Sequence, residues 1–396
     1  MRISSIDIFR ALTMVLMIFV NDLWSLTDIP GWLEHSAANV DFLGLADVVF
    51  PCFLVVMGMA IPFAIQNRLA KKESNFTISK HIIFRSVALL IMGVFTVEIP
   101  DLNPKFTGLS EALYALIMVI AFFMIWNVYP NTQGRNRLIY RSLQIVGMVV
   151  LIWLAIIYRG NPDGQSQVVG FRTQWWGILG LIGWSYLACA LIYLFGRNKP
   201  FVVITVAWMF FTLFSIAGHA GWLHRIWPDG PREWFVGNGA FHSFTLAGVI
   251  GGILLQKYAK PLQLGKILTW FVSLGLVMLA AGLIARHFFI ISKIRATPTW
   301  VLLCCAIAFV SFAILFWLVE YKGKGKWFQM IKIAGTNTLT CYLVPYLVYN
   351  VVVLSGLRLP SFALTGGVGL IKSVIYTALV LMITAILNRF KIRLSI

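Results

Sequence analysis

The chain has 396 residues, of which 60% are hydrophobic and only 12% are charged, against about 25% charged residues in an average soluble domain. This composition excludes an ordinary soluble enzyme. It predicts an all-α, polytopic membrane protein, because backbone groups in lipid must be paired within helices. The net charge of +18 does not indicate nucleic-acid binding, since the cations gather in loops between apolar segments.

Apolar stretches of about twenty residues, enough to cross the roughly 30 Å hydrocarbon core of a bilayer, recur along the whole chain. We expect about twelve transmembrane helices (ten to twelve), in a single transmembrane domain that extends over residues 1–396. The predicted spans are 6–24, 43–65, 82–98, 109–129, 141–158, 177–196, 200–217, 238–256, 266–285, 299–319, 335–354 and 367–388.

The charges predict how these spans are oriented. Roughly two thirds of the 32 Lys and Arg residues lie at the ends or in the loops that share a side with both termini, and the positive-inside rule places that side in the cytoplasm. Acidic residues such as Asp28 and Asp41 fall on the opposite side. A cluster of cations in one external loop does not fit the rule: Arg286, His287, Lys293 and Arg295.

The first span carries charges near its cytoplasmic end. Asp7 and Arg10 are three residues apart, so they share a helix face and can form a structural ion pair. The functional alternative is a site for a polyanionic cofactor, made by Arg10 together with Arg85 and Arg141. The sequence leaves both interpretations open.

Polar groups gather where the chain leaves the first span and enters the second. Asn21 and Asp22 close the first span, Glu34 and His35 lie in the following loop, and Asp47 lies inside the second span. Solvent exposure of His35 and a helix-dipole role for Asp47 are the simpler explanations. An ionisable residue inside a span, however, is costly and usually faces the protein interior or a cavity, so the cluster favours a functional site.

Two later spans hold further candidates. His242 begins the span 238–256 on the external side and is a candidate for substrate binding. Asn337 lies in the segment AGTNTLTCYLVPY, where a buried amide needs several partners and often contacts a ligand; we expect it at the cofactor site. The segment GVIGG at 248–252 predicts close helix packing. The five cysteines show no metal-ligand spacing, and we expect no metal.

Six segments of the chain form a recognisable set: SIDIFRALTMVLMIFVND, WLEH, GLADVVFPCFLVVMGMAIPFAI, GILGLIGWSYL, ATPTW and AGTNTLTCYLVPYL. This set resembles the transmembrane acyltransferase family that includes the heparan-α-glucosaminide N-acetyltransferases. The resemblance is to a bacterial-type relative without the lumenal N-terminal domain, and it implies a multi-pass protein of the bacterial inner membrane.

The resemblance also implies a reaction, in which an acetyl group moves from cytoplasmic acetyl-CoA to the amine of an extracytoplasmic glucosamine-type sugar. In this family a histidine of the first external loop and an asparagine closing the preceding helix are implicated in the transfer, and these match His35 and Asn21. We expect Asp22, Glu34 and His242 on the side of the acceptor. Membrane lipid is a further expected partner, and a homodimer is allowed.

These residue types suit acetyl transfer. A neutral imidazole accepts the proton of an attacking amine, the Asn21 amide could stabilise an oxyanion, and Asp47 could fix the tautomer of His35. Direct transfer and an acetyl-histidine intermediate both remain open. The alternative function is an amino-sugar or sugar permease, in which the prolines within spans, Pro51, Pro62 and Pro345, would serve alternating access.

Overall fold

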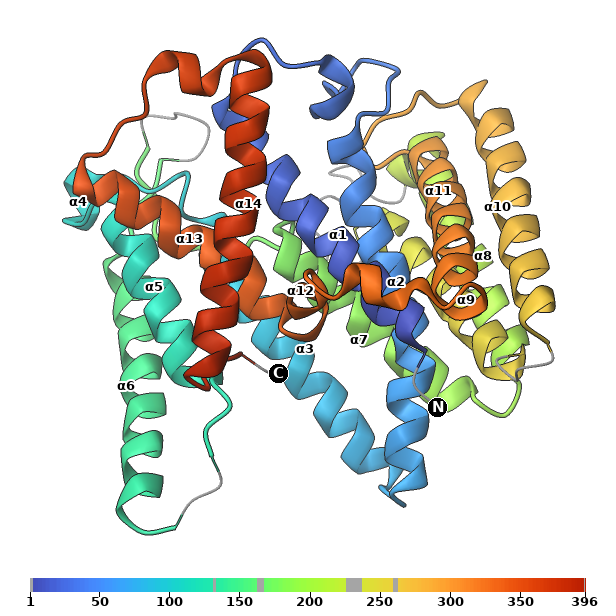
Figure 1. Ribbon diagram of the computed structural model, residues 1–396, viewed down its shortest axis with the longest axis horizontal. Coiled ribbons are helices and arrows are strands. Elements are labelled where there is room, and N and C mark those ends of the chain that lie inside the picture. Colours follow the sequence, from blue (N-terminus) through green and yellow to red (C-terminus); the bar gives the residue numbers. More distant parts are fainter. Residues whose placement is uncertain (1–2, 131–132, 162–166, 226–236, 259–262, 395) are drawn as a thin grey trace.

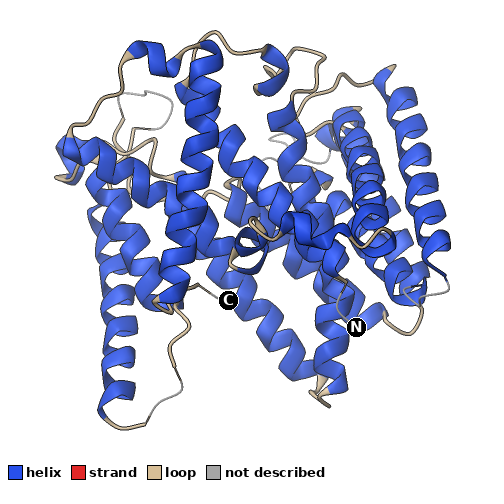
Figure 2. Ribbon diagram, in the orientation of Figure 1, coloured by secondary structure: helices blue, strands red, loops and turns tan. Residues whose placement is uncertain are grey.

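The computed structural model describes residues 3–130, 133–161, 167–225, 237–258, 263–394 and 396. Within these ranges the chain is helical, and its few β-contacts are isolated bridges rather than strands (Figure 2). The predicted all-α fold class is therefore confirmed.

Fourteen α-helices are described, joined by short 3-10 turns and one π-helical turn that extends α11. They are α1 (Ser4–Asp22), α2 (Leu45–Ala70), α3 (Asn75–Val97), α4 (Pro104–Thr107), α5 (Glu111–Trp126), α6 (Arg135–Ile157), α7 (Ile178–Gly196), α8 (Pro200–His219), α9 (Ala240–Tyr258), α10 (Leu264–Arg286), α11 (Pro298–Phe316), α12 (Lys332–Thr336), α13 (Thr338–Ser355) and α14 (Gly366–Arg389).

Nine of the described helices are long and apolar enough to cross a membrane, which makes the chain an integral membrane protein. The three remaining predicted spans correspond to α1, α5 and α9. Of these, α5 has only 16 residues, and α1 and α9 have 19 each but carry polar residues near their ends. The count of twelve crossings stays a prediction.

The helices divide into a centre and a rim. In α2, 72% of the most apolar stretch is buried by other helices, whereas in α6 only 17% is buried. Figure 1 shows α2 among α1, α3 and α7, with α5 and α6 on one flank and α10 and α11 on the other. The central helices can therefore carry polar side chains that lipid would not tolerate.

Small residues bring α2 and α9 into backbone contact. A Cβ at Gly58 would lie 2.0 Å from the carbonyl oxygen of Thr245, and one at Gly248 would lie 2.0 Å from that of Val55. Glycine is required at both positions, and the predicted packing role of the segment 248–252 is confirmed. The polar start of α9, which weakened it as a span, is enclosed by protein rather than lipid.

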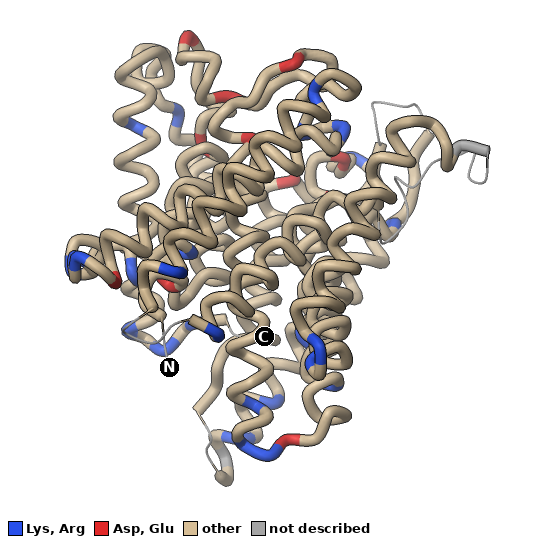
Figure 3. The backbone as a smooth tube through the Cα atoms, turned by 90° about the vertical axis from the view of Figure 1, so that its right-hand side faces the viewer, with Lys and Arg blue, Asp and Glu red and all other residues tan. Residues whose placement is uncertain are grey.

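Charge is distributed unequally between the two ends of the bundle. In Figure 3 most acidic segments lie toward the top and most Lys and Arg segments toward the bottom. The start of α1 and the end of α14 also lie in the lower half (Figure 1). This separation of charge accords with the predicted orientation. Which end of the bundle faces the cytoplasm stays a prediction. We call the end that holds the start of α1 and the end of α14 the basic end.

Candidate functional site

The candidate site is centred on the contact between His35 and Asp47. His35 Nδ1 lies 2.8 Å from Asp47 Oδ1, and the backbone amides of Ser36 and Gly44 donate to Asp47 Oδ2 at 3.0 and 3.3 Å. The Asp47 side chain is 1% exposed and that of His35 is 47% exposed. An ionised carboxylate only accepts hydrogen bonds, so Nδ1 is the donor in this contact, and in the neutral imidazole Nε2 keeps a lone pair.

Pro51 and Trp300 hold Asp47 through its backbone. Proline has no N–H, so the carbonyl four residues earlier in α2, that of Asp47, loses its helical partner. The indole Nε1 of Trp300 donates to this carbonyl at 3.0 Å. Trp300 is fully buried near the start of α11, where its ring packs edge-on against Phe244. The aspartate is therefore fixed at both its main chain and its carboxylate.

The loop that carries His35 touches the start of α2 at Gly44. A Cβ at Gly44 would lie 1.9 Å from the carbonyl oxygen of Glu34, so a larger residue would push this loop away. The Glu34 side chain, a predicted acceptor contact, is exposed next to His35 in the chain. Gly44 thus determines how closely His35 approaches Asp47.

The segment between α10 and α11 packs on the same loop. Asp41 pairs with Arg286 at 2.9 Å and accepts the amide of Ile291 at 2.7 Å, and Arg295 donates to Asn39. The Ile291 amide and, to a smaller extent, the Arg286 guanidinium hold the pKa of Asp41 below its usual value, although burial opposes them. Two of the cations predicted to be external, which the positive-inside rule does not explain, therefore bind the loop of His35.

A third cation of that segment reaches the histidine itself. Lys293 Nζ lies 3.2 Å from Nδ1 and 3.4 Å from Nε2 of His35. It also donates to the Ala46 carbonyl at 3.5 Å. The site on this end of the bundle is therefore an imidazole between a buried carboxylate and a lysine.

A cavity of about 370 Å³ opens at the basic end of the bundle. Its wall comes from six helices and the C-terminal residues: Arg10, Met14 and Met17 of α1, Phe53, Met57, Ala60, Ile61 and Ala64 of α2, Arg85 and Leu89 of α3, Leu179, Ile182 and Tyr186 of α7, Gly335 and Thr336 of α12, Thr338, Leu339 and Tyr342 of α13, and Leu394 and Ile396. We call it the arginine cavity.

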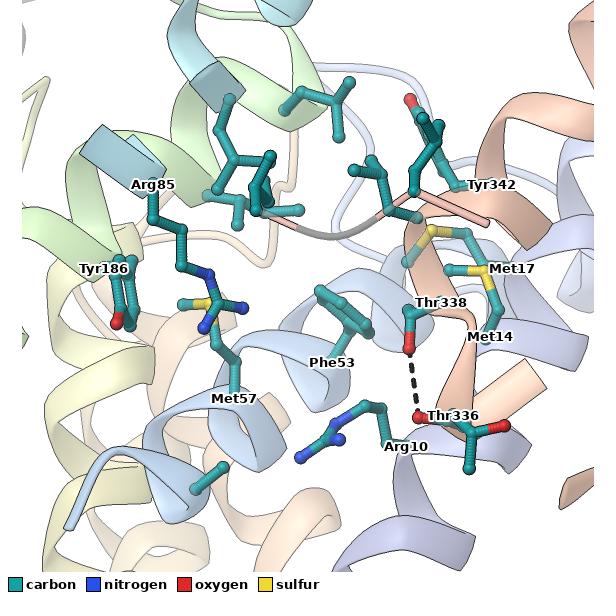
Figure 4. Close-up of a pocket in the computed structure, with 18 of the residues that line it drawn as sticks. Arg10, Met14, Met17, Phe53, Met57, Arg85, Tyr186, Thr336, Thr338 and Tyr342 are labelled. Atoms are coloured by element: carbon teal, nitrogen blue, oxygen red, sulfur yellow. Dashed lines mark hydrogen bonds between the residues drawn. The ribbon is translucent and has the colours of Figure 1, made fainter. Parts of the chain in front are cut away.

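Both arginines point into this cavity (Figure 4). The Arg85 guanidinium lies 4.6 Å from the ring centre of Tyr186, and its Nε is buried without a hydrogen-bond partner among the described residues. Arg10 lines the cavity and also approaches Asp7 at 3.6 Å. The structural pair and the cavity position, which the sequence left as alternatives, therefore coexist at Arg10.

The other two residues predicted to bind the cofactor, Arg141 and Asn337, are not among those that line the arginine cavity. Arg141 is exposed on α6 at the rim and is not among the residues that line the arginine cavity. Asn337 joins α12 to α13 and is 7% exposed. Its neighbours Thr336 and Thr338 line the cavity, whereas its own amide donates to the Thr336 hydroxyl at 3.4 Å.

A second cavity, of about 340 Å³, lies where α1 ends. Asn21 and Asp22 line it together with Trp24 and tyrosines of α13 and α14. Met17 and Tyr342 line both cavities, so the two hollows adjoin along α1. Within the described chain no hydrogen bond joins Asn21 to His35; Asn21 instead faces this second cavity.

Asp22 is enclosed by partners. Its carboxylate is fully buried and accepts from Lys372 Nζ at 2.9 Å, from the Ser373 hydroxyl at 2.5 Å and from the Tyr349 hydroxyl. These partners come from α13 and α14, so the pair ties the end of α1 to the C-terminal helices. Asp22 was predicted to bind the acceptor, and here its carboxylate binds other side chains.

His242 lies apart from His35. It is 2% exposed at the start of α9, and its ring stacks on Phe211 with centroids 4.7 Å apart. Its Nδ1 has no hydrogen-bond partner among the described residues. Phe241, the preceding residue, packs against Trp300, which connects this region to the wall behind Asp47.

Sequence reasoning missed three residues that complete these sites: Lys293 beside His35, Lys372 beside Asp22, and Tyr186 under Arg85. For two of these residues the sequence contains a feature that could have identified them. Lys293 violated the positive-inside rule, and Lys372 is a lysine inside an apolar span, where an unpaired charge would be costly. Tyr186 gave none, because an aromatic residue in a membrane helix is common.

Comparison with known proteins agrees with the sequence resemblance. A family model described as "Domain of unknown function (DUF5009)" matches residues 2–237. Heparan-alpha-glucosaminide N-acetyltransferase of Mus musculus is 31% identical over 146 residues, which cover 33% of this chain and 21% of the mouse protein. The Homo sapiens protein of the same name is 32% identical over 101 residues, covering 24% and 14%.

The chain therefore spans about a fifth of the length of the mouse protein it matches. The family model, by contrast, covers more than half of this chain. The chain belongs to the DUF5009 family.

Proposed function

We propose that this protein is a transmembrane acetyltransferase that uses cytoplasmic acetyl-CoA to acetylate the amine of an extracytoplasmic glucosamine-type sugar, in a bacterial inner membrane. The observation that carries the proposal is the pairing of a half-exposed His35 with a buried Asp47 at one end of a bundle whose other end holds the arginine cavity. The names of the partial relatives, both N-acetyltransferases, support the same reaction class.

The arginine cavity is the proposed donor site. The phosphates of CoA are polyanionic, and arginine offers several donors in a fixed fork that suits phosphate. Arg85 is the stronger candidate, because its Nε is buried without a partner among the described residues while Tyr186 holds the guanidinium in place. Arg10 is the second, although it also approaches Asp7.

The acetyl end of the donor has to travel from this cavity toward His35. Phe53, which lines the arginine cavity, lies about 9 Å further along α2 than Asp47 at 1.5 Å per residue. The second cavity continues the hollow along α1 as far as Asn21. In this proposal the thioester arm lies in the hollow between α1 and α2, and Asn21 donates to the developing oxyanion.

His35 is the proposed general base. Asp47 accepts a hydrogen bond from Nδ1–H, so Nε2 can take the proton of the acceptor ammonium or amine. The amine nitrogen bonds to the thioester carbonyl carbon, the carbon–sulfur bond breaks, the amine proton passes to His35, and CoA leaves as a thiolate that water protonates. An acetyl-histidine intermediate gives the same products in two transfers.

The test uses purified protein in proteoliposomes, with acetyl-CoA on the side of the basic end and labelled glucosamine on the other. We expect labelled N-acetylglucosamine, and no product with His35→Ala. If labelled sugar instead crosses the membrane unmodified, at equal rates with the unaltered protein and with His35→Ala, the enzyme proposal is refuted and the permease is favoured. The structural feature that supports a permease is the presence of Pro51, Pro62 and Pro345 inside helices.

A further inference from the structure

Lys293 brings a primary amine to the ring of His35. Its Nζ lies beside the ring, 3.2 Å from Nδ1 and 3.4 Å from Nε2, and Nε2 is the nitrogen that keeps a lone pair in the neutral imidazole when Nδ1 donates to Asp47. Burial lowers the pKa of the Lys293 ammonium, and the negative charge of Asp47 opposes this shift. A neutral amine therefore forms at Lys293 at a lower pH than at an exposed lysine.

The backbone around Lys293 is fixed, so this contact is built into the fold. The Ser292 hydroxyl donates to the Ala38 carbonyl at 3.0 Å, and the Ser292 amide donates to the Thr297 hydroxyl at 3.1 Å. On the other side of Lys293, Arg295 donates to Asn39. Holding a nucleophile next to its base replaces a bimolecular encounter by an intramolecular one.

We propose that the Lys293 amine occupies the position of the acceptor amine and is itself acetylated when no acceptor is bound. This inference rests on the proposed function, because an acetyl group has to reach His35. Lys293 Nζ bonds to the thioester carbonyl carbon, the carbon–sulfur bond breaks, the Nζ proton passes to His35 Nε2, and CoA leaves as a thiolate. The product is an uncharged amide that remains beside His35 and obstructs the acceptor.

The experiment incubates the full-length protein in proteoliposomes with labelled acetyl-CoA and no sugar, then measures acetylation of each lysine by mass spectrometry. Lys105, exposed on α4, is the matched control for purely chemical acetylation. We expect Lys293 to be labelled about a hundredfold faster than Lys105, the effect of a positioned base. Labelling of Lys293 should also rise at lower pH than that of Lys105, and glucosamine should suppress it.

Variants separate the outcomes. His35→Ala should lose the labelling of Lys293 and keep that of Lys105. Preincubation of the unaltered protein with acetyl-CoA alone should slow the later acetylation of glucosamine, and Lys293→Arg should abolish this slowing. Acetylated glucosamine with Lys293 labelled no faster than Lys105 would overturn this inference and leave the proposed function standing. Equal labelling of Lys293 in His35→Ala would also overturn it. Absence of both products would overturn the inference and the proposed function together.

Discussion

Two buried carboxylates, Asp22 and Asp47, illustrate different uses of charge in one membrane bundle. Asp22 is fully buried and is held by a lysine, a serine and a tyrosine from α13 and α14. Asp47 is equally buried, but its side-chain partner is His35, which is about half exposed. The carboxylate of Asp22 binds side chains of neighbouring helices, whereas that of Asp47 binds a ring that is about half exposed.

The difference follows from the hydrogen-bonding atoms that each partner keeps once it is paired with its carboxylate. The ammonium of Lys372 can only donate, so its pair with Asp22 is complete and serves packing between helices. The imidazole of His35 donates with one nitrogen and keeps an acceptor on the other, so its pair with Asp47 leaves one proton-accepting atom. We therefore expect structural effects from changes at Asp22 and catalytic effects from changes at Asp47.

The largest expected effect is that of His35→Ala on acetyl transfer. Removing the base should lower the turnover of glucosamine about 10⁴-fold, while the protein stays folded, because the side chain is half exposed. Product formation in proteoliposomes measures the first part and the unfolding temperature in detergent the second. His287→Ala, which removes an exposed histidine at the end of α10, is the control and should retain full turnover.

The second-largest effect is expected for Asp47→Asn, which should lower turnover about 10³-fold and leave the affinity for acetyl-CoA nearly unchanged. The amide keeps the shape of the carboxylate, but it can donate to Nδ1 and so favour the tautomer that has no lone pair on Nε2. Asp28→Asn is the matched control in the preceding loop, where the residue is exposed. An Asp47→Asn enzyme with normal turnover would show that Asp47, like Asp22, only supports the fold.

Asp22→Asn should instead destabilise the protein by about 3 kcal/mol, because it leaves the partly buried Lys372 without its counter-ion. The measurement is denaturant unfolding in detergent. The double variant Asp22→Asn with Lys372→Met should recover part of the loss, since it removes both charges. Unchanged stability of Asp22→Asn would contradict a structural role and return Asp22 to the candidates for acceptor binding.

The smallest expected effect concerns the arginine cavity. Arg85→Ala should weaken acetyl-CoA binding about tenfold, as loss of one charged hydrogen-bonding group does, with less weakening at high salt. Arg141→Ala should leave the affinity unchanged, because Arg141 is exposed on α6 and lies outside the cavity wall. Equal losses in both variants would point to a general effect of surface charge.

Much of the fold follows from local composition. Helices of the required length begin and end within a few residues of most predicted spans, because an apolar run in lipid has no alternative to the helix. The hydropathy signal for a membrane crossing is weaker at three helices, because α5 is short and α1 and α9 carry polar residues near their ends. At α9 the reason is tertiary, since neighbouring helices rather than lipid enclose its polar start.

For the site, the sequence alone predicts that His35 and Asp47 lie near one membrane edge and that most cations lie near the other. Their chain spacing and the apolar runs between them suffice for that. The pairing of Asp47 with His35 and of Asp22 with Lys372 becomes visible in the folded structure. So do the position of Arg85, but not Arg141, in a cavity wall and the contact of Lys293 with the histidine. These pairings join residues up to 350 positions apart, and hydropathy does not encode which helix faces which.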